Sequence, residues 1–394
     1  MNRKKIRAGF LILLALPLLA AGRFVFLGPG PSVVRHIVTQ EGYFDYQGVI
    51  HFHTGYSGDA TGTFEAIAGE AGKEEIDFLI STDHDTMKPL EDGKEGYYGK
   101  TLVLVGEELS LPEGYLLALG HQKLVKGGPT GDLIDQVNRQ GGFVVIAHPD
   151  HPRWKWKKEG DRGISGEEIL DFADQWYSAP VSRLAVALFA YPFNWRAGLL
   201  NIYQRPDETL ARWDARNKYG NRMTGIFAPD FHQALRVTGS YKFPFPPAEK
   251  ILPIAHDHIL LERPLRGNLP DDRRRVYEAI RMGRLFVAMD ILGNGAGFNF
   301  TAAQGSRKAM MGDTLPSGTM TFFSIRLPSL PSGERRRIRL LRDGKEIGAS
   351  EGGRFTFSDS APGVYRVEVE AGIPSFFGGT RQVVWIYSNP ICLK

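Results

Sequence analysis

Residues 48–60 read GVIHFHTGYSGDA, an apolar run that ends in two histidines one residue apart. In a β-strand, residues i and i+2 point to the same face, so His51 and His53 would direct both imidazoles toward one point. Two converging imidazoles suit a metal ion better than they suit a hydrophobic core. The alternative is a pair of ordinary strand histidines, and this motif alone does not decide between the two.

Four further apolar runs carry imidazoles or carboxylates where the predicted strand ends. They are FLISTDHDT at 78–86, LVLVGEELS at 102–110, FVVIAHPDHP at 143–152 and TGIFAPDFH at 224–232. The carboxyl ends of parallel strands share one edge of a sheet, which is where active sites form. Each motif alone could be a turn or a helix cap. Their joint occurrence predicts a multinuclear metal site, and mixed nitrogen and oxygen ligands suit Zn, Mn or Fe.

Around these motifs, residues 44–297 alternate apolar β-type runs with helical segments, the pattern of an α/β domain with parallel strands. The predicted strands are Gly48–Phe52, Phe78–Ser81, Leu102–Val105, Tyr115–Leu119, Phe143–Ala147, Leu184–Phe189 and Thr224–Phe227. The predicted helices are Thr63–Gly72, Gly131–Gln140, Gly166–Trp176, Glu208–Tyr219 and Asp271–Met282. Residues 298–394 differ: MTFFSIRL at 320–327, the turn Asp343–Gly344 and VYRVEVEA at 364–371 predict an all-β, sandwich-like domain.

The charge balance gives no support for a nucleic-acid partner. The chain has 394 residues and a formal net charge of +4. Four of its cations, Arg3, Lys4, Lys5 and Arg7, precede any predicted folded domain, and without them the net charge is +4 − 4 = 0. A near-neutral folded part does not present the excess of basic residues that a polyanion needs.

The N-terminus has the form of an export sequence. The four cations precede the apolar run AGFLILLALPLLAA at 8–21, so residues 1–22 are predicted to be a signal peptide or an N-terminal membrane anchor. We therefore expect an exported protein of the periplasm or cell envelope, with membrane contact only through this segment if it is not cleaved. The chain has one cysteine, Cys392, so no intrachain disulfide can form.

The order HxHT, TDHD, a strand-end GxE, AHP and DxH resembles the PHP (polymerase and histidinol phosphatase) family of metallohydrolases. The resemblance covers residues 44–297 and implies a distorted seven-stranded (β/α) barrel with two or three divalent metal ions at the carboxyl ends of its strands. Within the family, the chain is most similar to the exported, carbaryl-hydrolase-like branch. The features that carry this similarity are Trp213–Asp214, the late helix RRRVYEAIRMGRLFV at 273–287 and the closing WIYSNPI at 385–391.

The resemblance also implies a set of metal ligands. They are His51, His53 and Asp230 for the first metal, Glu108 as a bridge, His148 for the second metal, and His84, His232 and Asp59 for a third. Strand alternation lets only one of Glu107 and Glu108 face the site, and the GxE match selects Glu108. Asp83 and Asp85 are expected to orient imidazoles from behind.

Two positions depart from the family pattern. Ser57–Gly58–Asp59 stands where the family usually has Ser-Asp-Gly, so Asp59 must reach from one residue later. Tyr115 stands where the family often has a histidine that binds the second metal. The site is then either effectively dinuclear or completed by His121 or His151, and Tyr115 is either a substrate contact or an aromatic filling space.

The sequence shows no GxSxG, P-loop or Rossmann glycine motif, so we expect hydrolysis by a metal-activated water. The resemblance favours a phosphoester substrate. Carbamate or carboxylic ester hydrolysis by the same site is the alternative, and a metal-containing envelope binding protein without turnover is another. The two hydrolase interpretations predict a small-molecule ester as the substrate, and the binding-protein interpretation predicts an envelope glycan or protein as the partner.

Two other regions have open interpretations. Residues 152–180 and 233–255 are predicted to be long loops that either form substrate walls or pack against the β-domain. His256 and His258 form a second HxH pair, which we interpret as structural because no carboxylate or histidine cluster accompanies it at a matching strand end.

Overall fold

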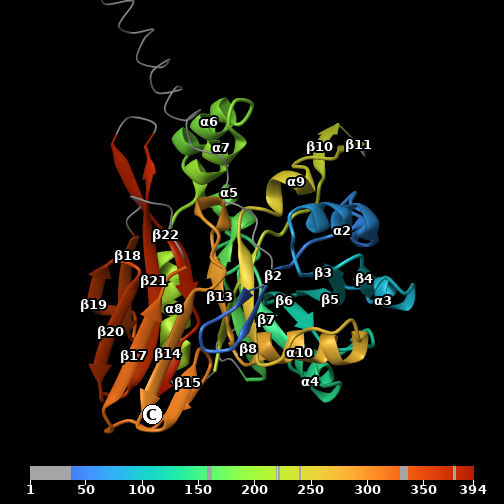
Figure 1. Cartoon of the computed structure of the whole chain (residues 1–394). Coiled ribbons are helices and arrows are strands. Elements are labelled where there is room, and N and C mark those ends of the chain that lie inside the picture. The colour runs from blue at the N-terminus through green and yellow to red at the C-terminus, as the bar shows by residue number, and fades with distance from the viewer. Residues whose placement is uncertain are drawn as a thin grey trace, which may run out of the picture.

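The computed structural model describes residues 37–157, 162–218, 220, 222–238, 241–328, 336–375 and 379–394 (Figure 1). The predicted signal or anchor at residues 1–22 lies outside them. Within the described ranges, no helix combines the length and the apolar character needed to cross a bilayer.

A large mixed sheet forms the centre of the molecule. Its strands in spatial order are β13 (Leu285–Ala288), β12 (His256–Leu261), β2 (Phe44–Ile50), β3 (Phe78–His84), β5 (Thr101–Leu111), β6 (Gly114–Leu119), β7 (Phe143–Ile146), β8 (Ile164–Asp171) and β9 (Thr224–Ala228). Four neighbouring pairs are parallel, β2/β3, β3/β5, β7/β8 and β8/β9. The expectation of parallel strands is wrong for β6, which runs antiparallel to both neighbours because only Pro112 and Glu113 connect it to β5.

The two ends of the run from β2 to β9 meet just past the strands. The backbone N–H of His53 donates to the carbonyl of Phe231 at 3.1 Å, and the N–H of Asp230 donates to the carbonyl of His51 at 3.1 Å. The sheet therefore curves until the carboxyl ends of its first and last parallel strands share hydrogen bonds.

Helices surround this sheet, and four of the five predicted ones, those at 63–72, 131–140, 208–219 and 271–282, begin and end within two residues of the predicted positions. They are α2 (Phe64–Lys73), α3 (Lys88–Glu91), α4 (Thr130–Arg139), α5 (Phe172–Ser178), α6 (Val181–Ala190), α7 (Trp195–Ile202), α8 (Asp207–Lys218), α9 (Ala248–Ile251) and α10 (Leu269–Arg281). Side-chain caps fix two of the starts: the Thr63 hydroxyl accepts from Ala66 N–H before α2, and the Asn268 amide oxygen accepts from Asp271 N–H in α10.

Two predicted elements are wrong: a segment predicted as a helix begins as a strand, and a segment predicted as a strand is helical. Residues 166–176 are not a helix: β8 occupies 164–171 and α5 only 172–178. The carboxylates of β8 look like the polar side of a helix, but all of them are buried. Glu167 pairs with an arginine, and Glu168 and Asp171 pair with imidazoles. Residues 184–189 are not a strand but part of α6, whose apolar run keeps its helical form by packing on α7.

The regions predicted to be long loops also contain regular structure. Residues 152–180 include β8 and α5, which is why so long a connection is tolerated in this fold. Residues 233–255 include the hairpin of β10 (Leu235–Thr238) and β11 (Tyr241–Phe243), followed by α9.

The described part of residues 298–394 is all β, as predicted. One antiparallel sheet has the order β15 (Arg307–Met310), β14 (Asn299–Gln304), β17 (Thr321–Arg326) and β20 (Arg354–Asp359). Facing it are β18 (Arg336–Arg342), β19 (Lys345–Glu351), β21 (Gly363–Pro374), β22 (Thr380–Ser388), β23 (Ile391–Leu393) and β16 (Thr314–Leu315). Phe323 of β17 stacks on Tyr365 of β21 with centroids 4.5 Å apart, so aromatic side chains join the two layers. The predicted turn Asp343–Gly344 connects β18 to β19, with both residues in the left-handed region.

The β-rich part is continuous with the central sheet, because β22 pairs antiparallel with β13. A buried charge network adds to this contact. The Arg366 guanidinium of β21 donates to both oxygens of Asp214 in α8, at 2.7 and 2.8 Å, and to Glu368 at 2.6 Å. The neighbouring Trp213 is fully buried and donates its indole N–H to the carbonyl of Met223.

Candidate metal centre

The predicted ligands do gather at the carboxyl ends of the strands. His51 follows β2 directly, while His148 and Asp230 stand two residues past β7 and β9. All three have left-handed backbone conformations, with φ of 72°, 52° and 43°. Such conformations are costly for residues other than glycine, and they concentrate where a site requires a particular side-chain direction.

Four predicted ligands meet at one point. The Nε2 atoms of His51 and His53 are 3.1 Å apart. Asp230 Oδ1 lies 3.3 Å from His51 Nε2 and 3.1 Å from His53 Nε2, and Glu108 Oε2 lies 3.4 and 3.2 Å from the same atoms. Donor atoms spaced by slightly more than 3 Å fit around one ion with bonds of about 2.0–2.2 Å.

Glu108 connects this point to a second one. Its Oε1 lies 3.1 Å from Nε2 of His148, while Oδ2 of Asp230 is 3.9 Å from the same nitrogen. The two oxygens of Glu108 thus face different imidazoles, as a bridging carboxylate requires. Glu107 points away and pairs instead with His121 at 3.0 Å, so only one of the two glutamates faces the centre, as strand alternation requires, and it is the one that the GxE match selects.

The remaining predicted ligands form a third, more open group. Asp59 Oδ2 lies 3.2 Å from His84 Nε2 and 3.4 Å from His232 Nε2. The side chains of His84 and His232 are 24% and 26% exposed, whereas those of His51 and His53 are fully buried. His84 also reaches Glu108 through Nδ1 at 3.0 Å. Asp59 does reach the site from its shifted position in the first loop.

The donor atoms fit a bound cation, because several of them have no other use. Both oxygens of Glu108, Oδ1 of Asp230, Oδ1 of Asp59 and Nδ1 of His84 are buried without a hydrogen-bond partner. Buried carboxylate oxygens normally find donors, and leaving them unpaired is costly. These residues could hold metal ions, and His53, Asp59, His84 and His232 form one of the groups with suitably spaced donors.

The electrostatics of the centre require positive charge. Burial opposes protonation of His51, but Glu168, Glu108 and Asp230 outweigh it and raise its pKa well above 6.5. Burial likewise opposes ionisation of Glu108, yet the charge of His51 and the adjacent imidazoles of His148 and His53 hold its pKa well below 4.5. The carboxylates stay ionised, and either protons or metal ions must neutralise them.

The sequence did not predict a role for Glu168 and Asp171, because the strand β8 that carries them was predicted to be a helix. Glu168 Oε1 accepts from His51 Nδ1 at 2.6 Å and its Oε2 accepts from the His148 backbone N–H at 2.8 Å. Asp171 Oδ2 accepts from His148 Nδ1 at 2.8 Å. Both hold an imidazole with Nε2 directed into the centre, the usual role of a carboxylate behind a ligand histidine. The run EEILD at 167–171 was the available signal.

Asp83 and Asp85 do not both act as expected. Asp83 accepts a hydrogen bond from the Ser57 hydroxyl at 2.7 Å. The Ser57 Oγ atom in turn accepts from Nδ1 of His53 at 2.9 Å, so Asp83 orients this imidazole through Ser57. Asp85 instead accepts from the backbone N–H of Ser110 at 2.9 Å. It supports the β5–β6 hairpin rather than an imidazole.

Tyr115 occupies a place beside the centre without adding a nitrogen ligand. Its ring lies 5.8 Å from that of His148 and 6.1 Å from that of His84. Of the two suggested substitutes, His121 is excluded because it pairs with Glu107 outside the centre. His151 stacks on Trp154 at 3.9 Å, and its Nδ1 accepts backbone N–H groups, so it belongs to an aromatic wall beside His148.

The second HxH pair does have carboxylates, which corrects the sequence interpretation. His258 contacts Asp45 at 2.8 Å and Asp290 at 3.0 Å, and His256 contacts Asp290 at 2.5 Å. The group could hold an ion by donor count. A separation of 2.5 Å is, however, a hydrogen-bond length and shorter than the spacing of two ligands around one ion, so we keep the structural interpretation.

This cluster predicts a pH-dependent stability. Burial opposes protonation of His258, but Asp45 and Asp290 outweigh it and raise its pKa from 6.5 to about 10. A raised pKa stabilises the fold fully below pH 6.5, and the contribution is lost as the pH rises through about 10. We expect His258→Gln to be less stable than the native protein at pH 7, with a difference that shrinks toward pH 10 in urea unfolding. A difference that stays constant over this range would contradict the assignment.

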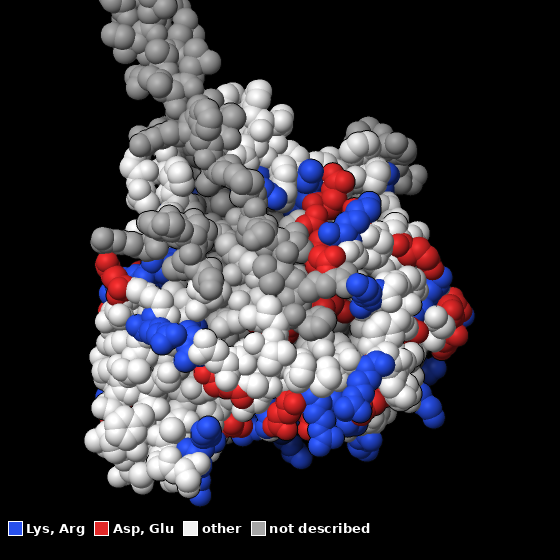
Figure 2. All heavy atoms as spheres, in the orientation of Figure 1, with Lys and Arg blue, Asp and Glu red and all other residues white. Residues whose placement is uncertain are grey.

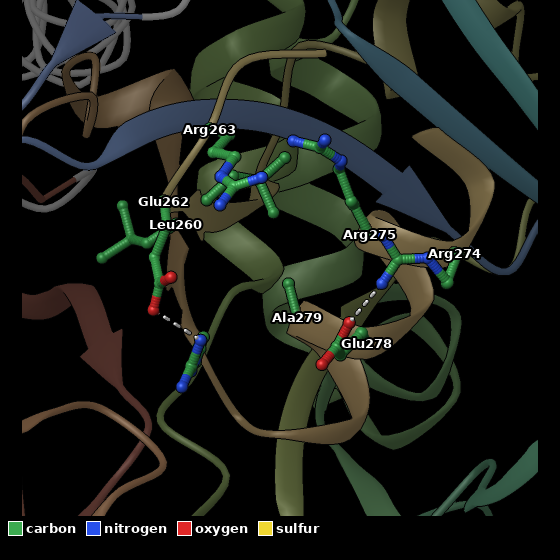
Figure 3. A pocket seen from close by; sticks show the side chains of 9 residues that line it. Leu260, Glu262, Arg263, Arg274, Arg275, Glu278 and Ala279 are labelled. Carbon is green, nitrogen blue, oxygen red and sulfur yellow. Dashed lines mark hydrogen bonds and ion pairs between the residues drawn. The ribbon is translucent and has the colours of Figure 1, made fainter. Parts of the chain in front are cut away.

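A surface pocket between the end of β12 and α10 is separate from the centre (Figure 3). Its lining is charged but contains no imidazole, and two of its arginines are paired, Arg274 with Glu278 at 3.1 Å and Arg284 with Glu262 at 3.2 Å. It therefore offers neither the metal ligands nor the unpaired carboxylates of the strand-end site.

Comparison with known proteins gives limited help. No family model matches the chain. Uncharacterized protein MJ1587 of Methanocaldococcus jannaschii is 28% identical over 139 residues, which cover 31% of this chain and 80% of that protein. Neither result names an activity.

Proposed function

We propose that the protein is an exported, metal-dependent hydrolase of the PHP type, acting on small-molecule esters, with phosphoesters as the first candidate. The observation that carries this proposal is the convergence of ligands from five strand ends around Glu108, whose two oxygens face different imidazoles. The hydrogen bonds that join β2 to β9 support a closed, distorted barrel of the seven strands β2, β3 and β5–β9. Export follows from the form of residues 1–22.

In this proposal, one set of residues binds the metal ions and another orients the ligand imidazoles. His51, His53 and Asp230 would hold one divalent ion, His148 with Glu108 a second, and His84, His232 and Asp59 a third. Bound ions of this kind supply a water of lowered pKa and stabilise negative charge on the substrate oxygen. Glu168 and Asp171 fix the imidazoles, and the exposed side of His84 and His232 leaves the substrate an entrance.

A second candidate, carbamate or carboxylic ester hydrolysis, has its own support. A phosphate group favours free cations at the rim, but Lys88 pairs with Asp92, and Arg222 lies near the amino end of β9, away from the centre. This leaves Arg153, which lies beside His151. On the other side, the rings of Tyr115 and Trp154 lie 5.8 and 5.6 Å from that of His148. Such an aromatic wall suits a flat, apolar leaving group.

The deciding experiment combines metal analysis with turnover on the full-length chain. An aryl phosphate, an aryl phosphodiester and an aryl carbamate are each supplied with Mn, Zn or Fe. We expect at least two ions per chain and release of phosphate or alkyl phosphate. Turnover of the carbamate alone would move the assignment to the second candidate. Bound metal without turnover of any ester would favour a binding protein, and less than one ion per chain would overturn the metal site itself.

A further inference from the structure

Large apolar side chains are exposed in one short segment of the chain. Among the described residues, twelve large hydrophobic side chains are exposed, and six of them lie within 176–193. They are Trp176 (37%), Tyr177 (59%), Val181 (82%), Leu188 (60%), Phe189 (51%) and Phe193 (70%). Isolated exposed apolar residues need no explanation, but a concentration of this kind marks an interaction surface.

The exposed residues form one face of a rigid hairpin. Val181, Ala185, Leu188 and Phe189 follow the i, i+4, i+7, i+8 spacing of a single helical face, and all are exposed. The opposite side of α6 packs on α7, where a Cβ on Gly198 would lie only 2.9 Å from the carbonyl oxygen of Ala187. Figure 1 shows α6 and α7 projecting together from the end of the molecule. The apolar face is therefore an outward side of a fixed element.

The composition of the segment indicates what this face meets. From Gln175 to Pro206 the chain has no Asp or Glu, while Arg183, Arg196 and Arg205 are present. Arg205 is committed to Glu368 and Asp207, which leaves a net positive segment. Tyr and Trp also occur along it, and Figure 2 shows the visible tip of the hairpin without charged side chains. Apolar residues flanked by Arg, Tyr and Trp are typical of a helix lying in an anionic lipid interface.

The surface begins beside the metal centre, on the side of His148. α5 begins directly after Asp171, which accepts from His148, so the segment starts where the ligands are. Tyr177 of α5 packs on His151 with ring centroids 4.9 Å apart, and His151 stacks on Trp154. An aromatic path therefore connects the exposed segment to the site.

We propose that the outward face of α5–α7 docks onto the surface of an anionic lipid bilayer and turns the entrance of the metal centre toward the membrane. This contact is separate from any anchoring by residues 1–22 and does not depend on the proposed hydrolase activity. A second copy of the chain is a poorer occupant. Two-fold pairing would bring the positive segments together, with no acidic residue in 175–206 to neutralise them.

A site-specific probe tests the proposal on the full-length chain, where anchoring alone cannot mimic docking. Val181→Cys and, as a matched exposed position on β17, Phe322→Cys are labelled with an environment-sensitive fluorophore, and the unchanged chain gives the signal from Cys392. On phosphatidylcholine–phosphatidylglycerol vesicles we expect about a threefold gain at position 181, quenched by nitroxide lipids, because such faces sink about 5–10 Å into the interface. The probe at position 322 is expected not to change.

The remaining outcomes are equally informative. Adding Leu188→Glu and Phe193→Glu should abolish the gain at position 181, while adding Met320→Glu should preserve it, with near-ultraviolet circular dichroism confirming that each variant is folded. No gain on vesicles would overturn the proposal. A high signal at position 181 before vesicles are added would also overturn the proposal, because it would mean that protein already covers this face. If that signal depends on protein concentration, the cover is a second copy; if it does not, the cover is the chain's own N-terminal segment.

Discussion

Replacing Glu108 with glutamine is expected to lower ester turnover by about a thousandfold or more, equivalent to about 4 kcal/mol in the barrier. The side chain keeps its shape, but the charge that faces four imidazoles is lost. An amide also offers one ligand oxygen in place of two, so it cannot bridge. We therefore expect bound metal to fall from at least two ions to at most one per chain, measured by elemental analysis beside the rate.

Glu107→Gln provides the matched control. Glu107 is the adjacent residue, is as fully buried as Glu108 and contacts an imidazole of its own, that of His121 at 3.0 Å. The same chemical change at this position should leave metal content and turnover close to native. Equal losses in the two variants would mean that the centre fails through general destabilisation of β5. Full metal content in Glu108→Gln would remove Glu108 from the ligand set.

The contrast between these glutamates shows what the sequence could predict. Alternation along β5 lets only one of the two face the site, and the GxE match identifies it as Glu108; the same two-residue period brings His51 and His53 to one point. The motifs that follow apolar runs do lie at one edge of the sheet, and Asp59 of the first loop lies beside His84 and His232. The shared edge of parallel strands predicts that these motifs meet, whereas the individual ligands, Asp59 included, were implied by the resemblance to the PHP family.

The errors occurred where burial contradicted residue type. A helix was predicted over 166–176, but its first part is the strand β8, on which the charged Glu168 and Asp171 are buried. In the fold these carboxylates are buried because imidazoles accompany them. α6 shows the converse, because Val181, Leu188 and Phe189 face outward, and a rule that places apolar runs inside makes it a strand. Partners that lie far apart in sequence decide both cases.

Replacing Arg366 with alanine is expected to cost about 3–5 kcal/mol of unfolding free energy, because it strands buried carboxylates. The Arg366 side chain is 1% exposed and donates hydrogen bonds to both oxygens of Asp214 in α8. It also donates to Glu368, which is fully buried. Arg205 and Arg339 still reach Glu368, so Asp214 bears the main loss. We expect a lower urea midpoint detected by both far- and near-ultraviolet circular dichroism.

Arg337→Ala on the neighbouring strand β18 is the control for this prediction. Its side chain is 41% exposed and pairs with Glu346 and Glu370, so its loss should cost at most about 1 kcal/mol. Adding Asp214→Leu to an Arg366→Leu background should cost much less than Asp214→Leu alone, because the second substitution removes a carboxylate that has already lost its partner. Additive losses, or equal costs for Arg366→Ala and Arg337→Ala, would show that the packing of Trp213 and the β13–β22 pairing, rather than this ion pair, hold α8 and β21 together.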